Sequence, residues 1–200
     1  MTGKLISFIG IDGAGKTSLV NLLKKEIEKK NYSVQIVYAG RGRSNVLPIQ
    51  ILGKIYRKSG GSESNVPING RKFEKLSVIH TLAAPIFAFD MFLRYLFIIL
   101  PAKFKNDFVL TDRYSTDLLL VNKVPDWLKR FLYSFFPKPN ELFYIYNTIK
   151  ILHKRKPDHS IEDLKRQEKI FKQLLSEINA TKIKNDSLSR SANKILEIIR

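Results

Sequence analysis

Short apolar runs alternate along the chain with segments in which apolar residues recur every three or four positions. Runs of five or six apolar and β-branched residues are typical of strands buried in a parallel sheet, whereas the longer period indicates covering helices. This order predicts a three-layer α/β fold, in which a five-stranded parallel sheet has helices on both faces. The expected strands are 4–9, 33–38, 107–112, 142–146 and, with the weakest pattern, 180–185.

Helical spacing marks five further stretches. We expect the second of them to break near Pro85, because proline removes a helical hydrogen bond and clashes with the preceding turn. The fourth begins at the capping sequence "SIED", near Ser160. The third has an apolar stripe made of Trp127, Leu128, Phe131, Leu132 and Phe135. The five stretches are 19–27, 73–100, a segment after residue 125, 160–178 and 192–199.

The most apolar segment is "PIFAFDMFLRYLFIILP", residues 85–101, and it includes Asp90 and Arg94. About 15 residues lie between its prolines, fewer than the roughly 20 that a helix needs to cross a bilayer. We therefore expect a buried helix and no membrane span. Apolar residues occur on nearly all faces of this helix, which predicts a second buried surface beyond a single core contact.

Composition limits the remaining possibilities. Two hundred residues with 44% hydrophobic content suit one globular domain over residues 1–200. The sequence contains no cysteine, which excludes disulfides and thiolate-bound metals. Because the start, "MTGKLISF", lacks the charged and apolar regions of a signal peptide, we expect a cytoplasmic protein.

Charge is the least ordinary property of the chain: 35 Lys and Arg against 18 Asp and Glu give a net charge of +17. Such a surplus attracts polyanions, but it is also typical of a lysine-rich solvated surface with no specific partner. The positive residues concentrate in 41–75 and in 150–172. We expect phosphate contacts in these two segments and only weak, non-specific binding of nucleic acid.

One motif carries the candidate chemistry. The sequence "GIDGAGKTS" lies between the first strand and the first helix, and it fits the P-loop pattern G-x-x-x-x-G-K-[ST]. In a P-loop the backbone N–H groups surround the phosphates of ATP, the lysine (Lys16) neutralises the outer phosphates, and the threonine hydroxyl (Thr17) holds Mg²⁺. The expected nucleotide contacts are Gly10, Ile11, Asp12, Gly13, Ala14, Gly15, Lys16, Thr17 and Ser18.

A second motif is "VLTDRYSTD", residues 109–117. Asp112 ends a predicted strand, where a parallel sheet presents residues to its ligand crevice. Its carboxylate suits a Mg²⁺ ligand, direct or through water, and the adjacent Arg113 can bind a phosphate with two N–H groups. The alternative interpretation is a simple ion pair at the end of the strand.

Together, "GIDGAGKTS" and "VLTDRYS" resemble the thymidylate kinase family of P-loop nucleoside monophosphate kinases, and the similarity extends through most of the chain. The resemblance implies the P-loop NTPase fold, ATP and Mg²⁺ as cofactors, a nucleoside monophosphate as the phosphate acceptor, and a homodimer. It also implies an acceptor-binding region at about 41–100 and a basic lid at about 150–165, which contains "HKRKPDH".

The resemblance assigns roles to single residues as well. Arg41, in "YAGR", matches the arginine that binds the acceptor phosphate, Phe87 matches the phenylalanine that stacks on the acceptor base, and Asp12 matches an aspartate near the acceptor sugar. The lid supplies the transition-state cation from Lys154, Arg155 or Lys156. The implied catalytic set is Asp12, Lys16, Arg113 and Arg155. His153 and His159 are expected at the surface, because the acceptor is already an anion and needs no general base.

The chain departs from the family pattern at three places. Met91 stands where the family has an arginine that reads thymine, and Asn147 stands where an aspartate usually follows the fourth strand. The segment at about 44–70 has no obvious counterpart, and its "SGGSESN" indicates a loop tip. Because methionine cannot donate a hydrogen bond to a base, we expect relaxed selection of the acceptor base.

Three hypotheses follow from the sequence. The first is an ATP-dependent nucleoside monophosphate kinase, with dTMP as the leading acceptor. The second keeps this chemistry but transfers phosphate to another nucleotide or a small phosphorylated metabolite. The third is a basic P-loop protein that binds nucleotide or nucleic acid with little catalysis, which the charge of +17 favours. The sequence lacks the aromatic-rich surface motif of common RNA-binding modules, which counts against this third hypothesis.

Overall fold

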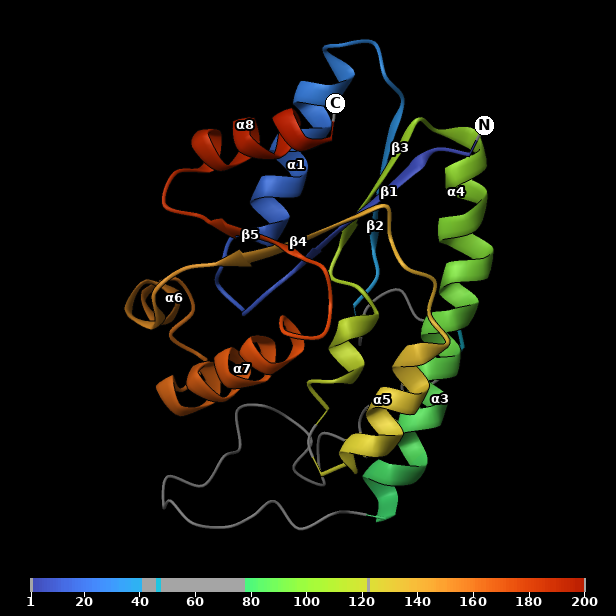
Figure 1. Ribbon diagram of the computed structural model, residues 1–200, viewed down its shortest axis with the longest axis vertical. Helices are drawn as coiled ribbons and strands as arrows, with labels where there is room; N and C mark the ends of the chain where they lie inside the picture. Colours follow the sequence, from blue (N-terminus) through green and yellow to red (C-terminus); the bar gives the residue numbers. More distant parts are fainter. Residues whose placement is uncertain (1, 41–45, 48–77, 122, 200) are drawn as a thin grey trace.

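A computed structural model describes residues 2–40, 46–47, 78–121 and 123–199 of the chain. Its centre is one parallel five-stranded sheet in the order β2-β3-β1-β4-β5 (Figure 1). The predicted sheet is thereby confirmed, and every strand lies within two residues of its expected position. The strands are β1 (Lys4–Ile9), β2 (Val34–Tyr38), β3 (Phe108–Asp112), β4 (Glu141–Tyr146) and β5 (Thr181–Lys184).

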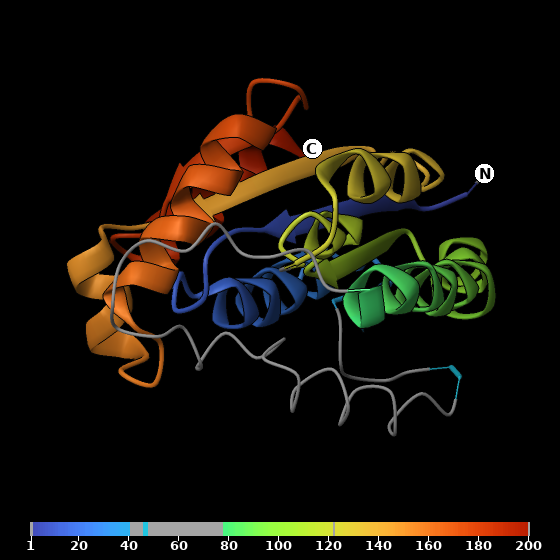
Figure 2. The same cartoon turned by 90° about the horizontal axis from the view of Figure 1, so that it is seen from below.

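Helices cover both faces of the sheet. Figures 1 and 2 show α1 and α8 on one side and α3, α4 and α5 on the other, so the predicted three layers are confirmed. The helices are α1 (Lys16–Glu28), α3 (Val78–Arg94), α4 (Leu100–Lys105), α5 (Asp126–Ser134), α6 (Ile149–Arg155), α7 (Ile161–Leu174) and α8 (Leu188–Ile198), with a π-helical turn η3 (Tyr95–Ile99) and a 3₁₀ turn η4 (Ser115–Leu118).

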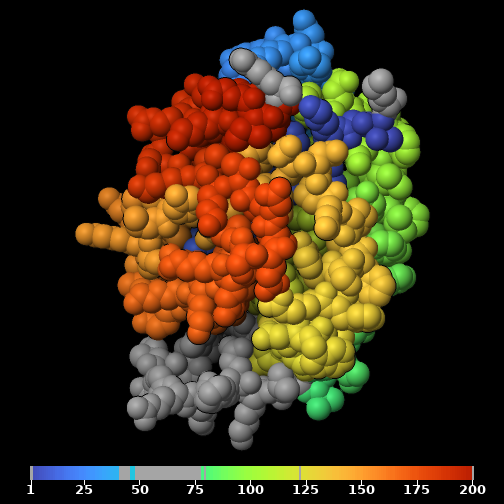
Figure 3. All heavy atoms as spheres, viewed as in Figure 1, coloured from blue at the N-terminus to red at the C-terminus, as the bar shows by residue number. Residues whose placement is uncertain are grey.

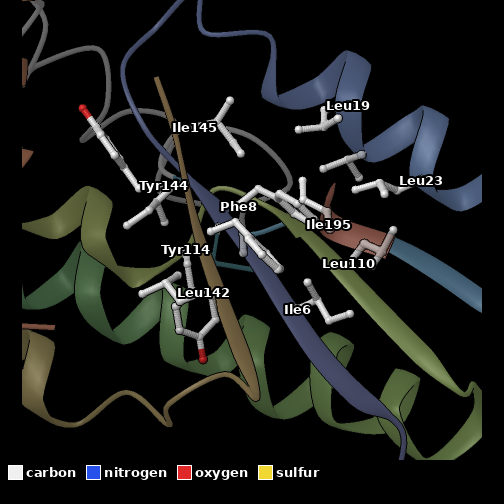
Figure 4. Packing of buried hydrophobic residues seen from close by; sticks show 14 of the residues in the cluster. Ile6, Phe8, Leu19, Leu23, Leu110, Tyr114, Leu142, Tyr144, Ile145 and Ile195 are labelled. Carbon is white, nitrogen blue, oxygen red and sulfur yellow. The ribbon is translucent and has the colours of Figure 1, made fainter. Parts of the chain in front are cut away.

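The main core joins the sheet to these helices. Figure 4 shows Ile6 and Phe8 of β1 among side chains from α1, α8, β3 and β4. Phe8 stacks on Phe143 of the neighbouring strand β4, with the ring centroids 5.6 Å apart. The strand register places Asp112 beside both Phe8 and Tyr38, so the carboxyl ends of three strands meet at one edge of the sheet. Residues of both motifs, the P-loop sequence "GIDGAGKTS" and the segment 109–117, lie at this edge of the sheet.

The helix on the far side of the sheet corrects one prediction. It does not break at Pro85: α3 continues through this residue, and η3 and α4 extend the helical run to Lys105. Pro85 is exposed, so its ring displaces no packed side chain, and the helix continues through it although the proline N cannot donate a hydrogen bond. Pro101 lies in the first turn of α4, a position where proline is tolerated.

The length argument against a membrane span is therefore wrong. Residues His80–Lys105 form a helical run of 26 residues with a mean hydropathy of 1.8, long and apolar enough to cross a bilayer by these two criteria. Core helices of soluble proteins pass the same test, which makes it weak support for a span. The expectation of a buried helix is also wrong in part, because Leu82, Phe89, Phe97 and Phe104 are more than half exposed.

The predicted apolar stripe of α5 divides between two environments. Leu128 and Leu132 pack against the protein, whereas Trp127, Phe131 and Phe135 are exposed.

At α7 the predicted cap is confirmed, because Ser160 precedes the helix and its hydroxyl accepts a hydrogen bond from the backbone N–H of Asp163. The helix ends at Leu174, four residues before the expected end.

Candidate active site

The loop between β1 and α1 has the backbone of a phosphate-binding P-loop. Gly10 and Gly15 have positive φ angles of 142° and 87°. A Cβ at Gly10 would lie 2.1 Å from the carbonyl oxygen of Ile145, and one at Gly15 would lie 2.5 Å from the amide nitrogen of Asn185. Only glycine fits these two positions, because they combine a left-handed backbone with close neighbours. The loop then turns into the N-terminus of α1, whose dipole favours an anion.

Lys16, the first residue of α1, is buried within this loop. Its ammonium group donates hydrogen bonds to the carbonyl oxygens of Gly10 at 2.8 Å and Ile11 at 2.9 Å. Burial, followed by the charge of nearby Arg113, lowers the pKa of Lys16 to about 8. Phosphate oxygens bound in the loop would give the ammonium group of Lys16 partners of opposite charge. These partners would take the place of the water that burial removes.

Thr17 and Asp112 form the candidate Mg²⁺ site. The hydroxyl of Thr17 lies 2.5 Å from Oδ2 of Asp112, which brings one oxygen from each motif together. Mg²⁺ prefers oxygen ligands and usually binds through one or two protein groups plus substrate phosphates and water. Among the described residues, no group of three or more His, Cys, Asp or Glu could hold a metal by itself. This donor set fits a magnesium ion that arrives with a nucleotide.

Arg113 lies immediately beyond β3 and has a left-handed backbone with φ of 67°. Its guanidinium forms ion pairs with Asp12 of the P-loop and with Asp117, the latter at 3.3 Å. Burial raises the pKa of Asp12, but the charges of Arg113, Lys16 and His159 outweigh it and hold that pKa below its usual value. The two carboxylates thus hold the guanidinium at the site by contacts that an incoming phosphate could replace.

One cavity of about 350 Å³ brings these groups together with residues of the predicted lid. Arg155 and Lys156 line it, whereas the third candidate lid cation, Lys154, is exposed and does not. Figure 3 shows the orange atoms of this part of the chain over the front face, with few blue N-terminal atoms visible between them. The cavity is lined by Asp12, Gly13, Gly15, Lys16, Thr17, Ser18, Tyr38, Asp112, Arg113, Arg155 and Lys156.

The lid contains contacts that the sequence did not reveal. His159, expected at the surface, has only 15% of its side chain exposed and lies between Asp12 and Asp163. Asp163 and Gln167 are buried on α7. The expectation was wrong because Asp12 comes from a distant segment, although the spacing of His159 and Asp163, four residues apart across a helix start, was a usable signal.

The two asparagines near the P-loop form a second unforeseen group. The side-chain amide of Asn147 donates to the carbonyl oxygen of Asn185 at 2.7 Å, and the amide of Asn185 donates to the carbonyl oxygen of Ala14, also at 2.7 Å. An ionised aspartate at position 147 would have no proton to donate. The departure at Asn147 therefore has a physical reason: it supports the loop with a neutral donor.

The acceptor-side residues are only partly described. Arg41 and the segment at about 44–70, including "SGGSESN" but excepting Val46 and Leu47, lie outside the described residues. Phe87 packs against Ala84 and Val121, and Met91 packs against Ala88 and Leu118 and is 5% exposed. In this conformation both side chains of α3 point toward apolar neighbours from η4, α5 and the chain between them, and Met91 presents no polar atom to a ligand.

A buried ion pair anchors the chain beyond β2 to α3. Oδ2 of Asp90 accepts a hydrogen bond from Arg94 at 2.9 Å, and both residues are 1% exposed. Arg94 also donates to the carbonyl oxygen of Gly40 at 2.6 Å, while Oδ1 of Asp90 accepts from the backbone N–H groups of Val46 and Leu47, each at 2.8 Å. One ion pair therefore holds the chain on both sides of residues 41–45.

Comparisons with known proteins add independent findings. No protein-family model matches the chain. A curated protein of Saccharolobus solfataricus, described as probable thymidylate kinase 2, is 35% identical over 159 residues. The match covers 78% of this chain and 64% of that protein, so the chain spans less than two thirds of the length of this relative.

Solved structures share the fold. Thymidylate kinase from Ehrlichia chaffeensis matches with a TM-score of 0.62 at 15% identity, over 100% of both chains. Thymidylate kinase from Candida albicans matches with a TM-score of 0.68 at 14% identity, over 99% of this chain and 91% of that one. At 14% and 15% identity these structures show a common fold. The identity of the phosphate acceptor depends on the residues of the site itself.

Proposed function

This chain is related in sequence and in fold to the thymidylate kinases, and on that premise we propose that it is an ATP-dependent nucleoside monophosphate kinase that phosphorylates dTMP. One observation carries the proposal: a single cavity collects a P-loop lysine, a threonine–aspartate pair, an arginine beyond β3 and two lid cations. We propose that residues 1–200 act as one kinase domain, with an acceptor region at about 41–100 and a lid at about 150–165.

The proposed transfer relies on positioning and charge, because phosphoryl transfer needs little covalent chemistry from the protein. The backbone N–H groups of the P-loop and Lys16 bind the donor phosphates. Thr17 and Asp112 would hold Mg²⁺, which would supply positive charge to neutralise the donor phosphates. Arg113 leaves its ion pair with Asp12 and binds the acceptor phosphate instead. Arg155 and Lys156 neutralise the phosphoryl group while it is transferred. The lid keeps water out, which favours transfer over hydrolysis.

Met91 bears on which acceptor is used. A site that pairs with a base can reject other bases strongly, whereas apolar contacts discriminate by only about 1–3 kcal/mol. Met91 offers no such pairing, and its known neighbours Ala88 and Leu118 are apolar. This observation favours a second candidate function, in which another pyrimidine monophosphate is phosphorylated about as well as dTMP.

We expect a coupled ADP-release assay to detect phosphorylation of dTMP, with kcat/KM for dTMP and dUMP differing by less than about 200-fold. Testing dTMP, dUMP, CMP, UMP, GMP and AMP with ATP and Mg²⁺ would identify the acceptor class. Met91→Arg should raise the preference for dTMP. A thousandfold preference for dTMP in the unmodified protein would show that another residue reads the base. The kinase proposal would be contradicted if ADP were released without any added acceptor and if none of the six monophosphates increased the rate of that release.

We also propose that the protein is a homodimer formed through α3, η3 and α4. Leu82, Phe89, Phe97 and Phe104 are exposed at spacings of seven or eight residues, which place them along one side of the helical run. A contiguous apolar surface of this kind is rare on monomers and typical of interfaces.

Sedimentation velocity at micromolar concentration should therefore give twice the mass of one chain. Phe97→Glu should shift the protein to the mass of a single chain, because it places a charge in the buried interface. Phe131→Glu, which alters an exposed aromatic residue on α5, is the matched control and should leave the dimer intact. A wild-type monomer at these concentrations would disprove the dimer without affecting the proposed reaction.

A further inference from the structure

Four residues link the lid to the P-loop in a closed series of contacts, here called the lid–P-loop network: Asp12, His159, Asp163 and Gln167. Nε2 of His159 lies 3.8 Å from Oδ2 of Asp12, and its Nδ1 lies 3.6 Å from Oδ2 of Asp163. Gln167 completes the series, because its amide donates to Oδ2 of Asp163 at 2.9 Å and its Oε1 accepts from the backbone N–H of Asp12 at 3.4 Å.

The α7 side of this network is fixed. The carboxylate of Asp163 has no exposed surface and accepts two hydrogen bonds from Arg166, at 2.8 Å and 3.0 Å. Burial raises the pKa of Asp163, but its contacts with His159, Arg166 and Gln167 outweigh that effect and lower the pKa. Asp163 is therefore a fixed anion, and its Oδ2 holds the imidazole of His159 in place. His153 helps to place this residue, because its Nδ1 lies 3.0 Å from the carbonyl oxygen of His159.

The P-loop side of the network changes partners during the proposed reaction. The carboxylate of Asp12 forms an ion pair with Arg113 and lies 4.0 Å from Lys16. Both cations turn to phosphate groups when the two substrates bind, as the proposed function requires. His159 then stays beside Asp12, because Asp163 holds it independently of any ligand.

We propose that His159 is a positioning residue that, held by Asp163, fastens the lid to the P-loop and orients the Asp12 carboxylate toward the acceptor. This inference rests on the proposed kinase function for its consequence, but the fastening itself needs no substrate. Because the lid is fastened to Asp12, its closure depends on the position of Asp12 beside the acceptor. The lid cations therefore reach the phosphoryl group only when the acceptor is correctly bound.

Other charged groups near His159 define the controls. Asp12 faces it from the P-loop, Asp158 from the lid and Asp163 from α7, while Lys156, Lys16 and Arg113 act on the same Asp12. Asp158 is a matched control, because its carboxylate lies 3.9 Å from the same Nε2 but is 74% exposed. Solvent screens such an exposed pair, so Asp158→Asn should have little effect.

The first test is hydrogen exchange of the ligand-free protein. We expect His159→Ala and His159→Gln to raise exchange of the backbone amides in residues 156–161 about tenfold, because each removes the contacts of the imidazole with two carboxylates. Asp158→Asn should exchange like the wild type. Unchanged exchange in both His159 variants would overturn the proposal, and this result is independent of any kinase activity.

The second test uses steady-state kinetics with dTMP and ATP. His159→Gln should raise KM for the acceptor about tenfold and leave KM for ATP within twofold. If His159→Gln has the kinetics of the wild type while His159→Ala does not, the side chain acts by filling space, and the proposed role of its contacts with the two carboxylates fails. A wild-type protein with no transfer activity would refute the proposed function and leave the exchange result standing.

Discussion

Replacing Lys16 with alanine is expected to lower kcat for phosphoryl transfer by about a thousandfold or more. Lys16 is the buried cation of the P-loop, at the N-terminus of α1, and no other described lysine lies within this loop. Cations that neutralise phosphate oxygens in the transition state contribute about 10³–10⁵ in comparable enzymes. The measurement is single-turnover transfer from ATP to dTMP at saturating concentrations, so that weaker ATP binding does not hide the loss in the chemical step.

The stability of the same variant serves as its control. Burial lowers the pKa of Lys16 to about 8 in the folded protein, against 10.5 when the chain is unfolded. Between these values the unfolded chain binds more protons, so the free energy of unfolding contributed by this residue rises with pH, by up to about 3 kcal/mol. Lys16→Ala should lose this rise and be no less stable than the wild type at pH 7. A variant that retains most of its turnover would disprove the P-loop assignment.

Replacing Asp90 with alanine is expected to lower the free energy of unfolding by about 3–5 kcal/mol. The change removes the carboxylate that Arg94 pairs with inside the protein, and it removes the acceptor of two backbone N–H groups, those of Val46 and Leu47. Breaking one partner of a buried ion pair is costly because the other charge stays away from water. Urea denaturation followed by circular dichroism would measure the difference.

A matched ion pair is available on α1. Lys24 and Glu28 are also four residues apart and lie 3.6 Å from each other, but both side chains are about two-fifths exposed. Glu28→Ala should change stability by less than about 1 kcal/mol, because exposed pairs are screened by solvent. Equal losses for Asp90→Ala and Glu28→Ala would mean that the Asp90–Arg94 pair contributes no more than a surface pair, contrary to its burial.

The sequence was most informative where structure depends on neighbouring residues. The apolar runs fixed the five strands, and "GIDGAGKTS" located the P-loop, because strand burial and the φ angles of Gly10 and Gly15 are encoded within a few positions. The cap at Ser160 was found for the same reason. Local patterns also placed Asp112 at a strand end, which is why its contact with Thr17 could be anticipated.

The predictions that failed depend on contacts between distant segments. A rule about helix interiors predicted a break at Pro85, but no local rule reports that this residue would face solvent. His159 was assigned to the surface because its partners, Asp12 and Asp163, meet only after the lid folds over the P-loop. The contacts of Met91, which the sequence did not predict, also depend on Leu118 of a different element. The roles assigned to the site residues stay predictions until they are measured.

The strand order also determines when this site can form as the chain is synthesised. The central strand β1 leaves the ribosome before the other four strands, yet its register pairs Lys4 with Phe108 and Ile6 with Glu141, residues that follow much later. Contacts of such long sequence separation form slowly, and domains complete their cores only when all elements are present. Until β3 and β4 emerge, the apolar residues of β1 lack both neighbours, and the loop that would bind ATP has no strand to support it. A nascent chain therefore has to be protected from aggregation until β3 and β4 have emerged, and bound nucleotide can assist only after that point.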